Sequence, residues 1–194
     1  MNRFHRWYCR TDRWRRGVQD LILPWALEGV ELDGRVLEIG PGPGLTTEVL
    51  ARRAGSLTAI EIDADLAGKL RERLAGSDVR VEHGDATAMP FDDGSFDAAV
   101  CFTMLHHVPS PELQDRLLAE VRRVLRPGGV FAGSDSRSSL VFRLAHLADT
   151  MVLVDPDTFA ARLERAGFVG ADVSTGRVGF RFRATVPAED RAMR

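Results

Sequence analysis

The sequence predicts an α/β fold, a doubly wound sheet of seven strands that is mostly parallel, with an antiparallel last strand and helices on both faces. Two observations predict it. Apolar runs alternate with helical patterns as far as residue 133, which is typical of βαβ units around a parallel sheet. Two extended runs separated by a short glycine-containing turn then close the chain, which indicates an antiparallel hairpin. With 194 residues, the chain has the size of one domain.

The first four strands are expected where apolar residues gather between the helical patterns. We expect them at residues 35–39, 57–62, 79–83 and 96–102. Helical patterns separate the first three of these strands. We expect the helices at 45–54, closed by Gly55, and at 65–74, followed by Gly76, because glycine commonly comes after the last turn of a helix.

The later part of the chain adds further helices and strands. Ser110, Pro111 and Glu112 open a helix with a capping hydroxyl, a proline at the first position and an early acid, and the Pro-Gly-Gly run at 127–129 is expected to stop it. A strand is expected at 130–133, followed by an amphipathic helix over 140–153. Asp155 then caps a helix that runs to residue 167, and the last strands are expected at 168–174 and 178–186.

A glycine-rich loop follows the first strand. Residues 36–44 read Val-Leu-Glu-Ile-Gly-Pro-Gly-Pro-Gly, and glycine allows the backbone to take positive φ and to approach a ligand closely. The dinucleotide fingerprint is G-x-G-x-x-G, whereas here Leu45 stands in the place of its third glycine. The two prolines in the loop have no N–H to offer to a pyrophosphate. The loop therefore favours a nucleoside ligand without a phosphate.

This loop resembles motif I of the class I S-adenosylmethionine-dependent methyltransferases, and the element order is similar to the Rossmann-like fold of that family. The resemblance covers roughly residues 31–186. It implies S-adenosylmethionine as the cofactor and methyl transfer by in-line displacement. The cofactor-binding residues that it implies are Glu38, Gly40, Gly42, Gly44, Glu61, Ile62, Asp85, Ala86 and Thr103.

Acids lie at the ends of three successive strands, at Glu38, Glu61 and Asp85. The carboxyl ends of parallel strands meet at one edge of a sheet, where doubly wound proteins bind their ligands. In the family, the matching acids orient the methionine end of the cofactor, accept from the ribose hydroxyls and accept from the adenine amine. Each acid alone could be a solvated loop residue, but their order after the glycine loop favours a cofactor site.

Histidines follow the fourth strand at His106 and His107. An imidazole can take up a proton near neutral pH, so either one is a candidate general base for a hydroxyl acceptor. The alternative is that one of them packs or forms hydrogen bonds within the loop. Asp135 is a further candidate for substrate contact, with capping as its alternative. We interpret Cys101 as an inert core thiol and His146 as a packing residue of its helix.

The N-terminal segment interleaves aromatic side chains with arginines. We divide the chain into an N-terminal helical cap (1–30), the methyltransferase domain (31–186) and a flexible tail (187–194). The cap is interpreted as a helix that packs on the core and covers the substrate as a lid. An RNA-contacting arm is the alternative, since arginine and aromatic side chains together bind phosphates and bases.

A nucleic-acid substrate has one specific argument for it and one against it. Residues 36–86 also resemble ribosomal RNA adenine dimethyltransferases, which carry an Asn-(Leu/Ile)-Pro-(Tyr/Phe) motif after the fourth strand. Residues 103–106 read Thr-Met-Leu-His instead. Residues 89–129 look like the methyltransferase type 11-like group, which includes quinone and other small-molecule methyltransferases. We therefore predict a small-molecule methyl acceptor, and the acceptor atom and the oligomeric state stay open.

The composition restricts the partners and the compartment of the protein. A net charge of −2 gives no general attraction to nucleic acid or an anionic membrane. Two cysteines without metal-ligand spacing predict no metal site and fit a reducing cytoplasm. No apolar stretch has the length of a membrane span, so no membrane insertion is expected. Besides a methyltransferase, the sequence leaves open an NAD-type oxidoreductase and a non-catalytic cofactor-binding module.

Overall fold

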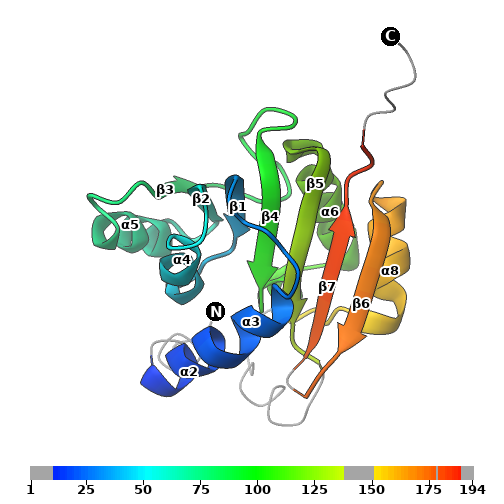
Figure 1. Ribbon diagram of the computed structural model, residues 1–194, viewed down its shortest axis with the longest axis horizontal. Helices are drawn as coiled ribbons and strands as arrows, with labels where there is room; N and C mark the ends of the chain where they lie inside the picture. The colour runs from blue at the N-terminus through cyan, green and yellow to red at the C-terminus, as the bar shows by residue number, and fades with distance from the viewer. Residues whose placement is uncertain (1–10, 138–150, 178, 189–194) are drawn as a thin grey trace.

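The computed structural model describes residues 11–137, 151–177 and 179–188, and its centre is a seven-stranded sheet in the order β3-β2-β1-β4-β5-β7-β6 (Figure 1). Strands β1 to β5 pair in parallel, and β7 is antiparallel to both β5 and β6, so the predicted fold class is confirmed. The strands are β1 (Arg35–Ile39), β2 (Ser56–Glu61), β3 (Arg80–His83), β4 (Phe96–Phe102), β5 (Leu125–Asp135), β6 (Val169–Thr175) and β7 (Phe180–Thr185).

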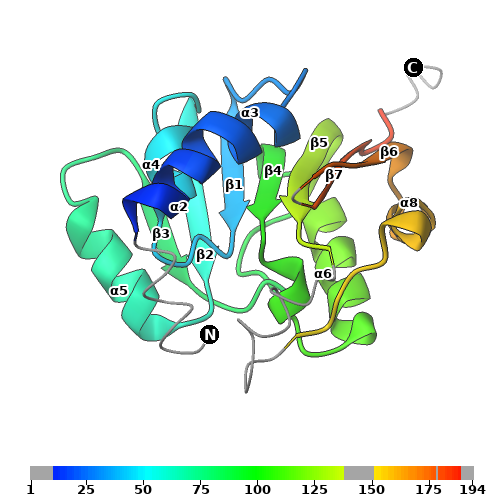
Figure 2. The same cartoon turned by 90° about the horizontal axis from the view of Figure 1, so that it is seen from below.

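Helices cover both faces of this sheet (Figure 2). Their bounds are α2 (Asp12–Gly17), η1 (Val18–Ile22), α3 (Leu23–Ala26), α4 (Leu45–Leu50), α5 (Ala64–Arg73), η2 (Leu105–His107), α6 (Pro111–Val124) and α8 (Pro156–Arg165). Within the described ranges, none of the helices is long and apolar enough to cross a membrane.

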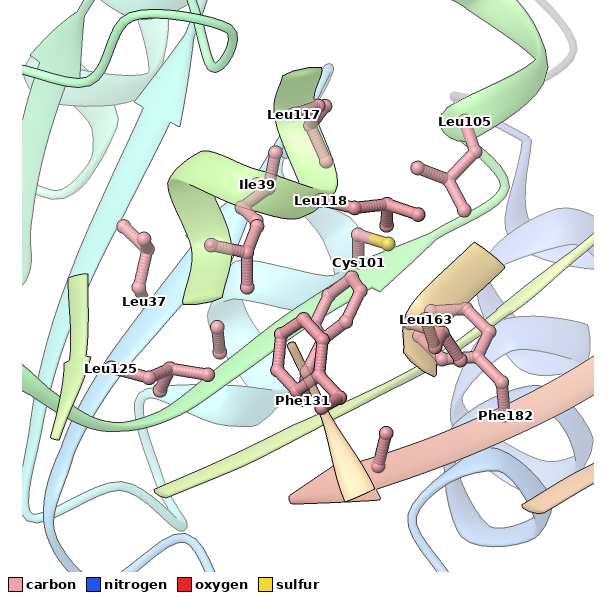
Figure 3. Close-up of a cluster of buried hydrophobic side chains, with 14 of the residues drawn as sticks. Leu37, Ile39, Cys101, Leu105, Leu117, Leu118, Leu125, Phe131, Leu163 and Phe182 are labelled. Carbon is pink, nitrogen blue, oxygen red and sulfur yellow. The ribbon is translucent and has the colours of Figure 1, made fainter. Parts of the chain in front are cut away.

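Neighbouring residues of the central strands pack into different layers, because successive side chains of a strand point to opposite faces. Val36 of β1 and Val100 of β4 pack with the N-terminal helices and α4. Leu37 and Cys101 pack instead with α6 and α8, in the cluster that Figure 3 shows around Phe131. Cys101 is fully buried, and burial, with a smaller effect from the charge of Asp135, raises its pKa well above the ordinary thiol value. The prediction of a core thiol is confirmed.

The N-terminal helical stretch contains a π-helical turn that the sequence did not predict. The Thr11 hydroxyl caps the start of α2 by accepting from the Trp14 N–H at 3.3 Å. Residues 18–22 then form the π-helix η1, and the Leu23 N–H bonds to the Val18 carbonyl, five residues back. Pro24 has no N–H to donate to the carbonyl four residues before it, which is a local reason for the α-helical pattern to change here.

Several boundaries differ from the prediction. The helix expected at 45–54 ends at Leu50, and β5 begins at Leu125 instead of residue 130. The Pro-Gly-Gly run does not stop the preceding helix, which ends earlier at Val124. Gly128 and Gly129 form backbone hydrogen bonds with Val186, so the run belongs to the sheet. At its other end, β5 continues past residue 133 through pairing with β7, so Asp135 is the last residue of the strand.

Two predicted segments fall mainly on residues that the structure does not describe. The helix expected over 140–153, including His146, lies almost wholly within 138–150. Its last residues are described, and residues 151–153 belong to neither a helix nor a strand. The tail expected at 187–194 is described only as far as residue 188.

Candidate functional site

A cavity of about 410 Å³ opens at the carboxyl ends of β1 to β4, the ends that carry the arrowheads of β1 and β4 in Figure 2. The strand order reverses between β1 and β4, and such a switch point is the usual ligand site of a doubly wound sheet. Most of the predicted cofactor residues line the cavity, namely Gly40, Gly42, Glu61, Ile62, Asp85, Ala86 and Thr103. Glu38 and Gly44 do not line it.

The glycine loop takes the backbone conformation for which glycine is suited. Gly40, Gly42 and Gly44 have φ of 65°, 54° and 77°. The Gly40 N–H donates to the Ile60 carbonyl and the Gly44 N–H donates to the Pro41 carbonyl, both at 2.9 Å. The Gly42 N–H donates to Glu61 Oε2, also at 2.9 Å. All three glycine N–H groups are thus used within the protein, and the loop holds its own shape.

Replacing Gly44 by alanine is expected to destabilise the fold by about 2 kcal/mol or more, because a Cβ here combines left-handed backbone with overpacking. At this φ of 77°, the Cβ would lie 2.3 Å from Leu70 Cδ1. Urea unfolding measures the effect. Gly68→Ala in α5 is the matched control, since a Cβ there meets nothing within 4 Å and should stabilise the helix by about 0.5–1 kcal/mol. Equal stability of the Gly44 variant and wild type would contradict the expectation.

Glu61 links the end of β2 to the glycine loop. Its side chain is buried, and it lines the cavity. While Oε2 accepts from Gly42, Oε1 accepts from the Asp63 N–H at 3.0 Å. Each carboxylate oxygen has two lone pairs, so both can accept a further hydrogen bond from a ligand hydroxyl. Glu61 therefore shapes the loop and offers acceptor capacity to the cavity.

Asp85 follows β3 on the same side of the sheet. It is exposed, and its Oδ1 accepts from the Thr87 N–H at 2.8 Å, which fixes the carboxylate in a turn. Within the described part of the chain, its Oδ2 accepts no hydrogen bond. Ile62 lies near it on the cavity wall and is 67% exposed, which is unusual for a large apolar side chain and leaves its surface available to a ligand.

Glu38 does not line the cavity itself, but it contacts the cavity-lining residue Thr46. It is 1% exposed, and its Oε1 accepts from the hydroxyl of Thr46, which lines the cavity. Burial raises the pKa of Glu38 from 4.5 to about 7; the Thr46 and Thr47 hydroxyls oppose this rise, and the charge of Glu61 adds to it. A carboxyl group in this position is protonated over part of the neutral pH range.

Substituting Glu38 by glutamine is expected to flatten the pH dependence of stability. Between pH 4.5 and about 7, the folded protein keeps a proton on Glu38 that the unfolded chain has lost, so wild-type stability falls as the pH rises through this window. An uncharged amide has no such dependence. Urea unfolding at about pH 5 and about pH 7.5 measures the difference, with Glu72→Gln on the exposed surface of α5 as control. An unchanged pH slope in Glu38→Gln would contradict the assignment.

The two candidate histidines have different surroundings. His107 is half-buried and lines the cavity. His106 is 1% exposed and does not line the cavity; its Nδ1 lies 2.5 Å from Asp135 Oδ1, and its backbone N–H donates to Asp135 Oδ2 at 2.9 Å. Asp135 is also buried and does not line the cavity. Of His106, His107 and Asp135, His107 is therefore the residue that lines the cavity and can contact a ligand there.

Thr103 marks the end of β4 with a strained backbone. Its φ of 50° is the one positive value at a non-glycine position in the described ranges. A β-branched residue is strongly disfavoured there, and such strain commonly persists at functional sites. The Thr103 N–H donates to the Ser134 carbonyl at 2.8 Å, so β5 holds the residue in place at the cavity wall.

Apolar side chains form a further part of the cavity wall. Trp14, Val18 and Ile22 contribute from the N-terminal helical stretch at intervals of four residues, and Val108 and Leu113 contribute from the region after β4. The sequence pattern placed the N-terminal segment over the substrate but did not identify Ile22 or the residues after His107. Their helical spacing was visible in the sequence, but it equally fits ordinary core packing.

Comparison with known proteins shows that the chain belongs to the methyltransferase domain family, whose model, described as "Methyltransferase domain", matches residues 37–133. The chain is 31% identical over 156 residues to the ubiquinone biosynthesis O-methyltransferase of Aromatoleum aromaticum, a match that covers 77% of this chain and 65% of that relative. The chain therefore spans just under two thirds of the relative's length.

Solved structures share the fold. A protein from Pyrococcus horikoshii OT3 superimposes with a TM-score of 0.75 and 20% identity, covering 92% of this chain and 94% of that one. The trans-methyltransferase CalH, in complex with SAH, superimposes with a TM-score of 0.63 and 22% identity, covering 78% of this chain and 51% of that one. At these identities the similarity shows the fold.

Proposed function

We propose that this protein transfers the methyl group of S-adenosylmethionine to a small-molecule acceptor. The observation that carries the proposal is the convergence of Glu61, Asp85 and the glycine loop on one cavity at the sheet's switch point. The volume of about 410 Å³ is within the usual range for small-molecule sites. Membership of the methyltransferase domain family supports the same activity.

The residues of the cavity fit this cofactor in several respects. The Glu61 carboxylate would accept from the ribose hydroxyls, and Asp85 Oδ2 would accept from the adenine amine. Glu38 would support the methionine end through its hydrogen bond with Thr46. When bound, S-adenosylmethionine supplies a methyl group on a positively charged sulfur that is already activated for displacement. The protein then mainly has to align the acceptor with that methyl group.

A dinucleotide fits the same loop poorly. A pyrophosphate is normally held by backbone N–H groups of a glycine-rich turn. Here the three glycine N–H groups donate to protein oxygens, and the two prolines have none. An NAD-type cofactor would therefore have to break existing hydrogen bonds of the loop, which favours S-adenosylmethionine.

The acceptor is proposed to bind in the part of the cavity between the N-terminal helices α2 and η1 and the residues after β4. Trp14, Val18 and Ile22 line one side, and His107 contributes an imidazole. This combination suits an apolar acceptor that presents a hydroxyl group. The relative in Aromatoleum aromaticum carries the name of an O-methyltransferase, which supports oxygen as the acceptor atom.

Calorimetric titration of the purified protein with S-adenosylmethionine, S-adenosylhomocysteine and NADH tests the cofactor. Micromolar binding of the first two ligands, without binding of NADH, is the expected result. A screen of phenols, amines and thiols for S-adenosylhomocysteine production then tests methyl transfer. Binding of NADH alone would overturn the proposal, and cofactor binding without any turnover would favour a non-catalytic binding module.

A further inference from the structure

The turn that carries His107 is held by buried polar groups that do not line the cavity. This turn is η2, a single turn of 3-10 helix between β4 and α6. Backbone groups of Leu105 and His106 bond to partners from separate parts of the chain, while the His107 N–H donates to the Met104 carbonyl at 2.9 Å. The conformation of the turn is therefore held by residues of other elements as well as by hydrogen bonds within the turn.

Asp135, at the end of β5, holds one side of the turn. Its two oxygens accept from the backbone N–H of His106 and contact His106 Nδ1, and Oδ1 also accepts from the Ser136 N–H at 2.7 Å. The His106 ring in turn lies against the His107 ring, with the ring centroids 4.2 Å apart. Asp135 thus fixes both the backbone and the side chain next to His107.

Gln114, in α6, holds the opposite side. It is 1% exposed, and its Nε2 donates to the Leu105 carbonyl at 3.1 Å and to the Val152 carbonyl at 2.8 Å. Its Oε1 accepts from Arg162 Nη1 at 2.9 Å. The Val152 N–H closes the network by donating to the His106 carbonyl at 2.8 Å. One buried amide therefore ties η2 to α8 and to the segment around Val152.

A buried amide or carboxylate is costly unless its hydrogen bonds are made, and an apolar side chain could fill the same volume. What an apolar side chain cannot do is fix the orientation of particular backbone carbonyl and N–H groups. Here those groups belong to the turn that places His107 at the cavity. We propose that Gln114 and Asp135 are positioning residues for His107, an inference that rests on the proposed function.

Two variants test this proposal from opposite sides of the turn. Gln114→Met keeps the shape but removes the donor to both carbonyls. Asp135→Asn replaces one carboxylate oxygen by an NH₂ group, which cannot accept from the backbone N–H groups of His106 and Ser136. Asp115→Asn is the control for the surface part of the network, because Asp115 bonds to Arg162 and not to η2, and asparagine keeps an Oδ1 acceptor for Arg162. If Gln114→Met does not fold, Gln114→Asn provides a milder shortening.

NMR of the histidine rings tests the proposal without a methyl acceptor. The signal of His107 is assigned as the one that disappears when His107 is substituted. In folded Gln114→Met and Asp135→Asn, the His107 signal is expected to shift or split, while that of the exposed His83 stays unchanged. Once an acceptor is identified, kcat of both variants is expected to be roughly 10- to 100-fold lower than that of wild type, since small misplacements of a catalytic group have such effects. The affinity for S-adenosylhomocysteine is expected to stay unchanged. Asp115→Asn should match wild type in both measurements.

An unchanged His107 signal in both folded variants would overturn the proposal, and so would a loss of thermal stability with kcat intact. The proposed function fails by a different result, the absence of S-adenosylmethionine binding in wild type. In that case the ligand-free His107 spectra still decide whether Gln114 and Asp135 position the ring.

Discussion

Glu61→Ala is expected to weaken S-adenosylmethionine binding by roughly 100-fold, since hydrogen bonds to a charged group contribute about 1.5–3 kcal/mol. The substitution acts in two ways. It removes the acceptor proposed for both ribose hydroxyls, and it leaves the Gly42 N–H without the oxygen that now holds the glycine loop at 2.9 Å. Calorimetric titration of the variant and wild type with S-adenosylmethionine measures the change.

Control variants distinguish the loss of a contact with the ligand from a loss of folding. Glu82→Ala removes a carboxylate from the neighbouring strand β3, where it pairs with Arg80 away from the cavity, and should leave affinity unchanged. Asp85→Ala should weaken binding less than Glu61→Ala, because Asp85 is exposed and a water-facing hydrogen bond contributes less. Wild-type affinity in both folded variants, Glu61→Ala and Asp85→Ala, would contradict the assignment of the cofactor end.

The cofactor end of the cavity could be predicted because its determinants are local. Glu61 closes the apolar run of β2, Asp85 comes two residues after β3, and the glycines begin directly after the apolar run of β1. Once the strands are parallel, their carboxyl ends meet at one edge, so no long-range information is needed to bring these residues together. The positive φ at all three glycines follows from the same local chemistry.

The acceptor end depends on contacts between distant parts of the chain. Nothing around Gln114 distinguishes it from a surface glutamine of an amphipathic helix, and its partners lie 9, 38 and 48 residues away. The different roles of His106 and His107 likewise depend on Asp135, 29 residues further along the chain. The extended start of β5 depends on pairing with Val186. Local propensity carries no signal for such pairings.

The protonation of the buried Glu38 is expected to depend on whether a ligand occupies the cavity. Its pKa of about 7 depends on burial and on the nearby charge of Glu61, while the Thr46 hydroxyl connects it to the cavity wall. A cationic ligand beside Thr46 would favour the charged form of Glu38, because an opposite charge lowers a carboxyl pKa. Cofactor binding is therefore expected to release part of a proton near neutral pH, which calorimetry in buffers of different ionisation enthalpy can measure.

His107→Gln is expected to lower kcat by roughly 100- to 10,000-fold for a hydroxyl acceptor, the usual contribution of a general base. Glutamine keeps much of the shape and polarity of the side chain but cannot take a proton. Affinity for S-adenosylhomocysteine should stay unchanged, since the cofactor is proposed to be held by Glu61 and Asp85 and not by His107. Rates of S-adenosylhomocysteine formation with a phenolic acceptor identified in the screen measure the effect.

The pH dependence of this variant distinguishes a base from a packing residue. Wild-type activity should fall as the pH drops, because a general base must be unprotonated to accept the proton of the acceptor. In His107→Gln the low rate should instead rise toward about pH 10, where a phenol ionises without help from the protein. His106→Gln is the comparison, because it should lower stability by disrupting the contact with Asp135. Full turnover of the phenolic acceptor by His107→Gln at neutral pH would contradict the role of His107 as the general base.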